Sequence, residues 1–261
     1  MVTSVAGVRL WEQVRMWSNS FECTKEFNIA TISPVPVNPA VRAVCVNPLA
    51  TLVLLGTAGS EIYEIATTSG KATLLAEGHC EDELWGLATH PTARNLVATC
   101  GDDKTVRVID IARHAVTIRK QFDCMMRAIA WSPDGTLLGV GMGGRVGRGK
   151  QKKDGAHVIL RSDTLDVVHE GRDSKEWIQE VKFSPDGSRF AVGSHDNKIY
   201  LYNARGNRFT PTVQLVKHNS YITHFDFSVD STVVQSNCGG YELLFCATDA
   251  RVHARTLRAR G

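Results

Sequence analysis

One motif recurs along this 261-residue chain: four to six alternating residues followed by a turn that begins at or near proline. The turn positions are Pro48, Pro91, Pro133, Pro185 and Val229, where valine takes the place of proline. The intervals between them are 43, 42, 52 and 44 residues. Because self-similarity at a fixed period indicates stacked copies of one supersecondary unit, this repeat constrains the fold more than composition does.

Each unit contains short strands joined by polar turns. An apolar stretch follows every proline turn and predicts a strand, at residues 52–56, 96–100, 137–141, 190–193 and 233–236. A tight polar turn and another strand come next, most clearly at 101–104 and 106–110. Short alternating strands separated by Gly, Asp, Asn and Pro indicate an all-β chain. Four strands in about 40–45 residues are typical of a WD40-type β-propeller blade.

The repeat also sets the expected domain boundaries. Residues 1–30 are predicted to form the later strands of a partial opening blade, residues 31–250 five blades, and residues 251–261 a basic C-terminal tail. The one long interval is assigned to a basic insertion at 144–153. Because propellers gain stability by closing a ring of blades, and about seven blades are common, we expect the ring to be completed by another segment of a longer polypeptide or by another chain.

Several single residues fit structural roles in the repeat. Gly78-His79 matches the Gly-His pair that opens many WD repeats, and Trp11-Glu12 resembles the closing Trp-Asp pair. Asp103 and Asp196 lie in tight turns, where a carboxylate is expected to bond nearby backbone amides. Trp85 begins one copy of the recurring motif. These five residues are therefore assigned to the architecture.

The blade sequences resemble those of the echinoderm microtubule-associated protein-like family. The resemblance is carried by residues 78–91 (GHCEDELWGLATHP), by 102–107 (DDKTVR), 191–196 (AVGSHD) and 220–226 (SYITHFD), and it runs in order over residues 8 to 250. It implies the second, atypical propeller of a tandem module from the long multi-repeat members. It also implies tubulin, microtubule or axonemal protein partners and a location in the cytoplasm and cytoskeleton, including the ciliary axoneme.

Positive charge is concentrated in two short segments. Residues 145–154 carry a net charge of +4 and residues 251–261 another +4, so the rest of the chain is at −5. The insertion joins the second and third strands of its blade, on the face that bears the loops between blades. We predict that its cations contact an acidic partner, the alternative being a solvated insertion without one. The predicted partner-binding residues are Arg145, Arg148, Lys150, Lys152 and Lys153.

No catalytic, cofactor or metal set emerges from the sequence. Residues 144–150 fit the pattern G-x-x-x-x-G-K of a nucleotide-binding loop, but Gln151 stands where Ser or Thr would bind magnesium, and a strand is predicted to follow in place of a helix. The nine histidines lack the spacing of a metal motif, and the insertion has no aromatic residue for stacking on nucleic acid. No apolar run reaches the ~20 residues of a membrane span.

The seven cysteines form no C-x-x-C pair and are expected to be reduced thiols, with Cys45, Cys100 and Cys246 inside apolar strands. Together these patterns favour a non-catalytic, microtubule-associated scaffold that binds proteins through its loop faces. The alternative is a general WD40 adaptor in a non-cytoskeletal complex.

Overall fold

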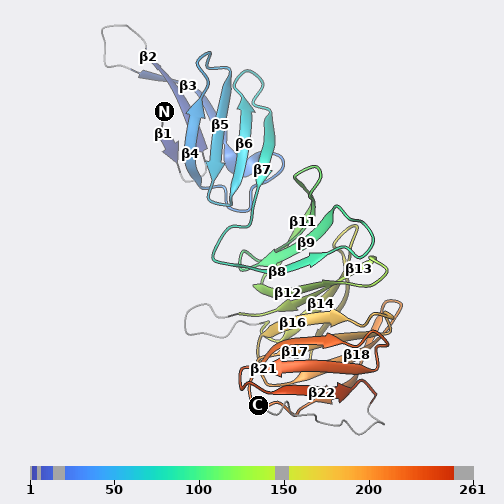
Figure 1. Ribbon diagram of the computed structural model, residues 1–261. Helices are drawn as coiled ribbons and strands as arrows, with labels where there is room; N and C mark the ends of the chain where they lie inside the picture. The colour runs from blue at the N-terminus through green and yellow to red at the C-terminus, as the bar shows by residue number, and fades with distance from the viewer. Residues whose placement is uncertain (1, 5–6, 14–20, 145–152, 250–261) are drawn as a thin grey trace. The chain divides into compact units, whose positions relative to one another are not determined.

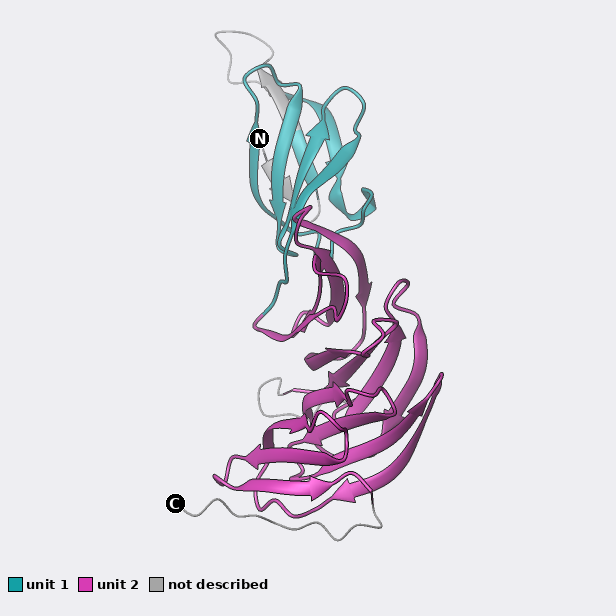
Figure 2. Ribbon diagram, turned by 45° about the vertical axis from the view of Figure 1, so that its right-hand side comes forward, with its two compact units in different colours: residues 1–81 teal, residues 82–261 magenta. Residues whose placement is uncertain are grey.

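The computed structural model describes residues 2–4, 7–13, 21–144 and 153–249. Over these residues the chain is all-β apart from the three-residue 3-10 helix η1 (Ile29–Thr31). Its strands form six antiparallel sheets of three or four strands each (Figure 1). The predicted fold class, an all-β array of about five blades with a partial opening blade, is confirmed. The chain divides into two compact units, Met1–Glu81 and Asp82–Gly261 (Figure 2).

Unit 1 consists of two sheets and η1. The sheet orders are β1-β2-β3 and β4-β5-β6-β7. The side chains of Val8, Ile29, Val53, Tyr63 and their neighbours form one buried cluster that joins the two sheets. The strands are β1 (Val2–Ser4), β2 (Gly7–Gln13), β3 (Phe21–Asn28), β4 (Val41–Val46), β5 (Leu52–Thr57), β6 (Glu61–Ala66) and β7 (Ala72–Glu77).

Unit 2 is an arc of four successive blades. The first strand of each blade lies beside the first strand of the next, in the order β8, β12, β16, β20. The first two blades contain β8 (Leu84–Thr89), β9 (Leu96–Gly101), β10 (Thr105–Asp110), β11 (Ala115–Gln121), β12 (Met126–Trp131), β13 (Leu137–Met142), β14 (Ala156–Arg161) and β15 (Val167–Arg172). The last two contain β16 (Ile178–Phe183), β17 (Arg189–Ser194), β18 (Ile199–Arg205), β19 (Arg208–Leu215), β20 (Ile222–Phe227), β21 (Val233–Cys238) and β22 (Leu243–Ala247).

The blades of unit 2 are held together face to face by apolar side chains. Val106 and Val108 of one blade share a buried cluster with Met126, Leu138 and Val140 of the next. Glycines let the sheets approach closely: a Cβ built on Gly141 would lie 2.4 Å from Ile178 Cγ2. The burial of apolar side chains between neighbouring blades is repeated along the arc. It is the main stabilising interaction that the repeat of about 43 residues predicts.

The recurring Ser-Pro-Asp-Gly turns are stabilised by their own side chains. Ser132 Oγ donates to Asp134 Oδ1 at 2.5 Å, and that carboxylate also accepts from the Thr136 backbone N–H. The hydrogen bond from Ser132 lowers the pKa of Asp134. Gly135 then takes the left-handed conformation, with φ of +74°. Equivalent Ser-to-Asp bonds occur at Ser184 and Ser228, so these serines have a structural role in their turns.

One cysteine lies outside the core that the sequence predicts for it. Cys100 and Cys246 are buried, but Cys45 is exposed although it belongs to β4. Side chains of a strand alternate between the two faces of the sheet. Val44 and Val46 pack against the core of unit 1, so Cys45 between them points to the other face. The expectation that other strands complete the ring stays a prediction.

Candidate functional site: the loop face of unit 2

Five side chains form a continuous row along the loop side of four successive blades. We call this row the aromatic ladder; it consists of Trp85, Arg127, Trp177, His195 and Tyr221. Its members come from β8, β12, the loop before β16, the turn after β17 and the loop before β20. The row therefore connects all four blades of unit 2 on the side where the interblade loops lie. Trp85 and Tyr221, at its two ends, are exposed.

The first half of the ladder is built around a buried cation. The guanidinium of Arg127 lies 4.0 Å from the Trp85 ring centre and 4.8 Å from that of Trp177. Asp102 neutralises it at 3.3 Å and also accepts the Trp85 Nε1–H at 3.1 Å. Burial lowers the pKa of Arg127 while Asp102 opposes that effect. A planar guanidinium suits this position, since it can stack on rings and pair with a carboxylate together.

The second half of the ladder is a run of stacked rings. The rings of Trp177 and His195 have centres 4.0 Å apart, and those of His195 and Tyr221 are 4.5 Å apart with an interplanar angle of 15°. His195 Nε2 also contacts Gln179 Oε1 at 3.1 Å, which fixes the orientation of the imidazole. The Tyr221 ring covers Gly239, where any Cβ would lie 2.5 Å from the ring edge. These contacts hold the aromatic rings of the loop face in fixed positions before any partner binds.

The basic insertion begins against this ladder. A Cβ on Gly143 would lie 2.6 Å from Trp177 Cβ, and one on Gly144 would lie 2.7 Å from Arg127 Nε. Both glycines have positive φ, and the Gly144 N–H is accepted by Asp154 Oδ1 at 3.1 Å. The insertion joins β13 to β14, the second and third strands of their blade. Its root is therefore anchored beside the ladder.

The predicted partner-binding cations fall mostly outside the described residues. Arg145, Arg148, Lys150 and Lys152 are among those the structure does not describe. Lys153 is described, and its ammonium lies 3.3 Å from Asp123 and 3.4 Å from Glu170. Part of the positive charge that is predicted to contact a partner is therefore neutralised by carboxylates of the protein itself. The nucleotide-loop alternative lacks its structural context, because the strand β14 follows the insertion where such a loop needs a helix N-terminus.

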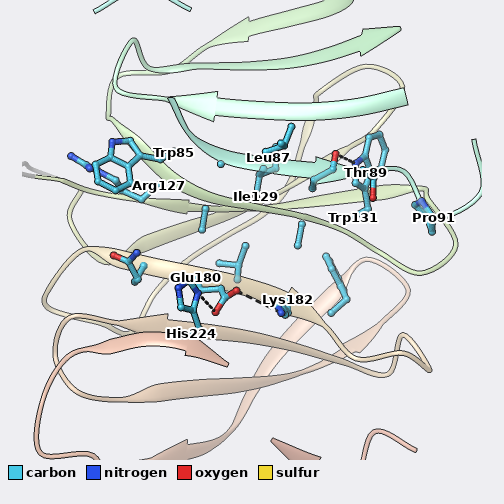
Figure 3. A pocket seen from close by; sticks show the side chains of 17 residues that line it. Trp85, Leu87, Thr89, Pro91, Arg127, Ile129, Trp131, Glu180, Lys182 and His224 are labelled. Carbon is cyan, nitrogen blue, oxygen red and sulfur yellow. Dashed lines mark hydrogen bonds and ion pairs between the residues drawn. The ribbon is translucent and has the colours of Figure 1, made fainter. Parts of the chain in front are cut away.

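A groove of about 660 Å³ runs along the first strands of the blades. Figure 3 shows Trp85 and Arg127 at one end and Trp131 and Pro91 at the other. Glu180 lines the groove; its carboxylate accepts the Phe225 N–H at 2.7 Å and lies 3.6 Å from the Lys182 ammonium. Burial raises the pKa of Glu180. The groove meets the loop face at Trp85 and Arg127, so one partner segment could contact both.

The other residues singled out from the sequence lie apart from the ladder's surface. Asp103 accepts the backbone N–H of Thr105 at 3.0 Å, as expected of a turn aspartate, and pairs with the buried Arg107 at 3.3 Å. Asp196 accepts from hydroxyls, those of Ser174 and Tyr200, at 3.0 and 2.6 Å, instead of the expected backbone amides. The burial of Tyr200 beside the turn explains this, since its hydroxyl needs an acceptor.

The last two of these residues fall in or beside unit 1. His79 lies between β7 and β8, at the end of unit 1, and Trp11 lies in β2 with a side chain outside the described part. Neither residue belongs to the ladder.

Radially adjacent four-stranded sheets, packed face to face with their first strands side by side, define a WD40-type β-propeller protein. The sequence signature described as "Echinoderm microtubule-associated protein second beta-propeller" matches residues 84–259. The chain belongs to this family, and the matched region covers the ladder, the groove and the insertion. The family resemblance predicted from the blade sequences is therefore confirmed.

Individual relatives agree with this assignment. Echinoderm microtubule-associated protein-like 2 of Rattus norvegicus is 34% identical over 245 residues, covering 93% of this chain and 35% of the relative. The 77 kDa echinoderm microtubule-associated protein of Strongylocentrotus purpuratus is 37% identical over 178 residues, covering 67% of this chain and 24% of the relative. The chain thus spans about a quarter to a third of the length of these relatives. Their names describe association with microtubules. Among the described residues, no helix has the length and hydropathy of a membrane span.

Proposed function

We propose that this chain is a non-catalytic, microtubule-associated scaffold that binds tubulin through the loop face of unit 2. The observation that carries the proposal is the anchoring of the basic insertion beside the aromatic ladder, in a chain of a family named for microtubule association. Cations on the insertion would meet acidic tubulin segments, and the exposed rings of Trp85 and Tyr221 would supply apolar contact area. A cytoskeletal or axonemal location follows from the same proposal.

The contact is expected to be strongly dependent on salt. Exposed charges attract over a Debye length of about 10 Å at 0.1 M ionic strength, and about 3 Å at 1 M. Binding through the insertion should therefore be strong at low salt and weak at high salt. Rings on the ladder should contribute a part of the affinity that salt does not remove.

Co-sedimentation of the whole chain with stabilised microtubules tests the proposal. In one variant Arg145, Arg148, Lys150 and Lys152 are replaced by Gln, and in a matched control the four arginines of the tail, at 251, 255, 258 and 260, are replaced by Gln. Both variants lose four positive charges. We expect the first to lose at least about tenfold in low-salt affinity, and the second to lose less.

Two results would overturn the proposal. One is the absence of pelleting by the unsubstituted chain at low salt. The other is equal loss in the two variants, which would show that net charge and not the loop face determines binding. Microtubules stripped of their acidic tails by limited proteolysis provide a further comparison, because the insertion variant and the unsubstituted chain should then bind them almost equally.

A further inference from the structure

Three potential metal ligands converge in the last blade, away from the ladder. His218 lies in the loop between β19 and β20, Cys238 ends β21, and Glu242 lies in the turn before β22. Their ligand atoms, an imidazole nitrogen, a thiol sulfur and a carboxylate oxygen, all lie within 4.8 Å of one another. His218 Nδ1 is 3.8 Å from Glu242 Oε2, and Cys238 Sγ is 3.6 Å from the same oxygen.

The imidazole of His218 is buried and oriented toward this cluster. Only 2% of its side chain is exposed, and Nε2 is 2.8 Å from the Ser236 hydroxyl. In the tautomer that donates Nε2–H to Ser236, the lone pair of Nδ1 faces Glu242 and Cys238. Nδ1 has no hydrogen-bond partner in the described part of the chain. An orphaned buried nitrogen is costly and rare, so its position beside a thiol and a carboxylate requires an explanation.

The carboxylate is also held in place. Glu242 accepts the backbone N–H of Asn219 at 3.0 Å and the Asn219 side-chain amide at 2.7 Å. Outer partners of this kind, a hydroxyl on the second ring nitrogen and an amide on the carboxylate, are what orient the ligands of protein metal sites. The side chains of His218 and Glu242 are therefore already oriented, by Ser236 and Asn219 respectively.

We propose that His218, Cys238 and Glu242 form a site for a divalent metal ion of the zinc class. One nitrogen, one sulfur and one oxygen ligand suit zinc, which takes all three types in four-coordinate sites. Calcium and magnesium require oxygen ligands and would not use the thiol. The fourth position would be open to water at the partly exposed side of Glu242.

A metal ion bound at this site would cross-link two loops of the last blade. Binding replaces the S–H bond of Cys238 with a metal–sulfur bond and releases that proton to solvent, so that the thiolate becomes the ligand. The metal would then join the β19–β20 loop to the β21–β22 turn. Because such a site does not exist in the unfolded chain, its binding free energy would add to the stability of unit 2.

Cobalt(II) titration followed by absorption tests this proposal, because a cysteine ligand gives a thiolate-to-cobalt charge-transfer band. The titration is made on the full chain with Cys23→Ser and Cys45→Ser, which removes the two exposed thiols that could bind cobalt on their own. We expect a saturable band of one equivalent that zinc displaces, and a rise in Tm with zinc.

Matched variants locate the site. In that background, Cys238→Ala should abolish the band, whereas Cys246→Ala, which removes another buried thiol of the same blade, should retain it. Ser236→Ala should weaken cobalt binding by roughly 10- to 100-fold through loss of the outer partner. Circular dichroism verifies that each variant is folded. If Cys238→Ala does not fold, Glu242→Gln is titrated in its place. The proposal would be overturned if the folded background protein gave no band, or if the band were unchanged by Cys238→Ala or Glu242→Gln. The cluster would then be a hydrogen-bonded group of side chains that binds no metal.

Discussion

The guanidinium of Arg127 is placed 4.0 Å from the Trp85 ring centre, and both side chains contact the same carboxylate, that of Asp102. Trp85 and Asp102 belong to one blade and Arg127 to the next, so this three-residue unit ties two sheets together at the loop face. The same three residues therefore stabilise the packing of the two blades and form part of the surface where the basic insertion begins.

Removing the charge of Arg127 should be strongly destabilising. Arg127→Met keeps much of the side-chain volume but leaves Asp102, only 4% exposed, without its counter-ion. Breaking one half of a buried ion pair typically costs about 3–5 kcal/mol, so the urea midpoint should fall markedly. Arg113→Ala is the control: its side chain is 80% exposed and its pair with Asp110 should contribute less than about 1 kcal/mol. Equal losses in the two variants would contradict the role assigned to Arg127.

A methyl group at the blade interface should be costly where the sheets approach most closely. Gly141→Ala would place its Cβ 2.4 Å from Ile178 Cγ2 of the next blade, and overpacking of this kind costs roughly 1–3 kcal/mol. Gly56→Ala provides the comparison, because its Cβ would meet nothing nearer than Ala43 at 4.0 Å. We expect thermal unfolding to show a lower Tm for the first variant and little change for the second. If neither variant changed the Tm, the sheets would lie farther apart than the structure describes.

The repeat was sufficient to predict the blades. The stretch predicted at 137–141 corresponds to β13 (Leu137–Met142), and that at 96–100 to β9 (Leu96–Gly101). These positions follow from local alternation and turn chemistry, which the sequence carries directly. The location of the insertion between β13 and β14 follows in the same way.

The aromatic ladder could not be predicted by the same reasoning. The repeat pattern assigns Trp85 only a structural role and does not distinguish Arg127 or Trp177 from their neighbours. Their contacts join residues 42 and 50 positions apart, and depend on side-chain orientation at the edges of separate sheets. One signal was available: Trp85 and Arg127 each lie six residues before the proline of their unit, and Trp177 and Tyr221 each lie eight before Pro185 and Val229. The cluster of His218 with Cys238 and Glu242 is likewise formed by the tertiary fold.

A buried histidine should make the stability of unit 2 depend on pH. His157 is fully buried, and burial lowers its pKa to about 4 from the ordinary 6.5. Below pH 6.5 the unfolded chain takes up a proton that the folded chain does not bind until about pH 4. The free energy of unfolding should therefore be fully retained above pH 6.5, and fall by about 1.4 kcal/mol per pH unit, about 3 kcal/mol in all, as the pH drops to 4.

Urea unfolding at a series of pH values measures this effect. His157→Leu should remove that part of the pH dependence, and its own stability at pH 7 should change little, since both ring nitrogens of His157 lack hydrogen-bond partners within the described residues. His114→Asn, at an exposed position, is the matched control. A pH profile that His157→Leu leaves unaltered would rule out His157 as its source.

The ion pairs of Lys153 predict that the cations of the insertion are not equivalent in partner binding. Lys153 lies 3.3 Å from Asp123 and 3.4 Å from Glu170, so part of its field is cancelled before any partner arrives. Lys153→Gln should therefore reduce low-salt microtubule binding less than Lys150→Gln does, by less than about threefold. Conversely, Asp123→Asn together with Glu170→Gln should strengthen binding, because these changes release the field of Lys153 toward the loop face. Co-sedimentation across a salt series measures both effects. If Lys153→Gln weakens binding as much as Lys150→Gln, and the carboxylate variant gains nothing, the two ion pairs do not influence the interface.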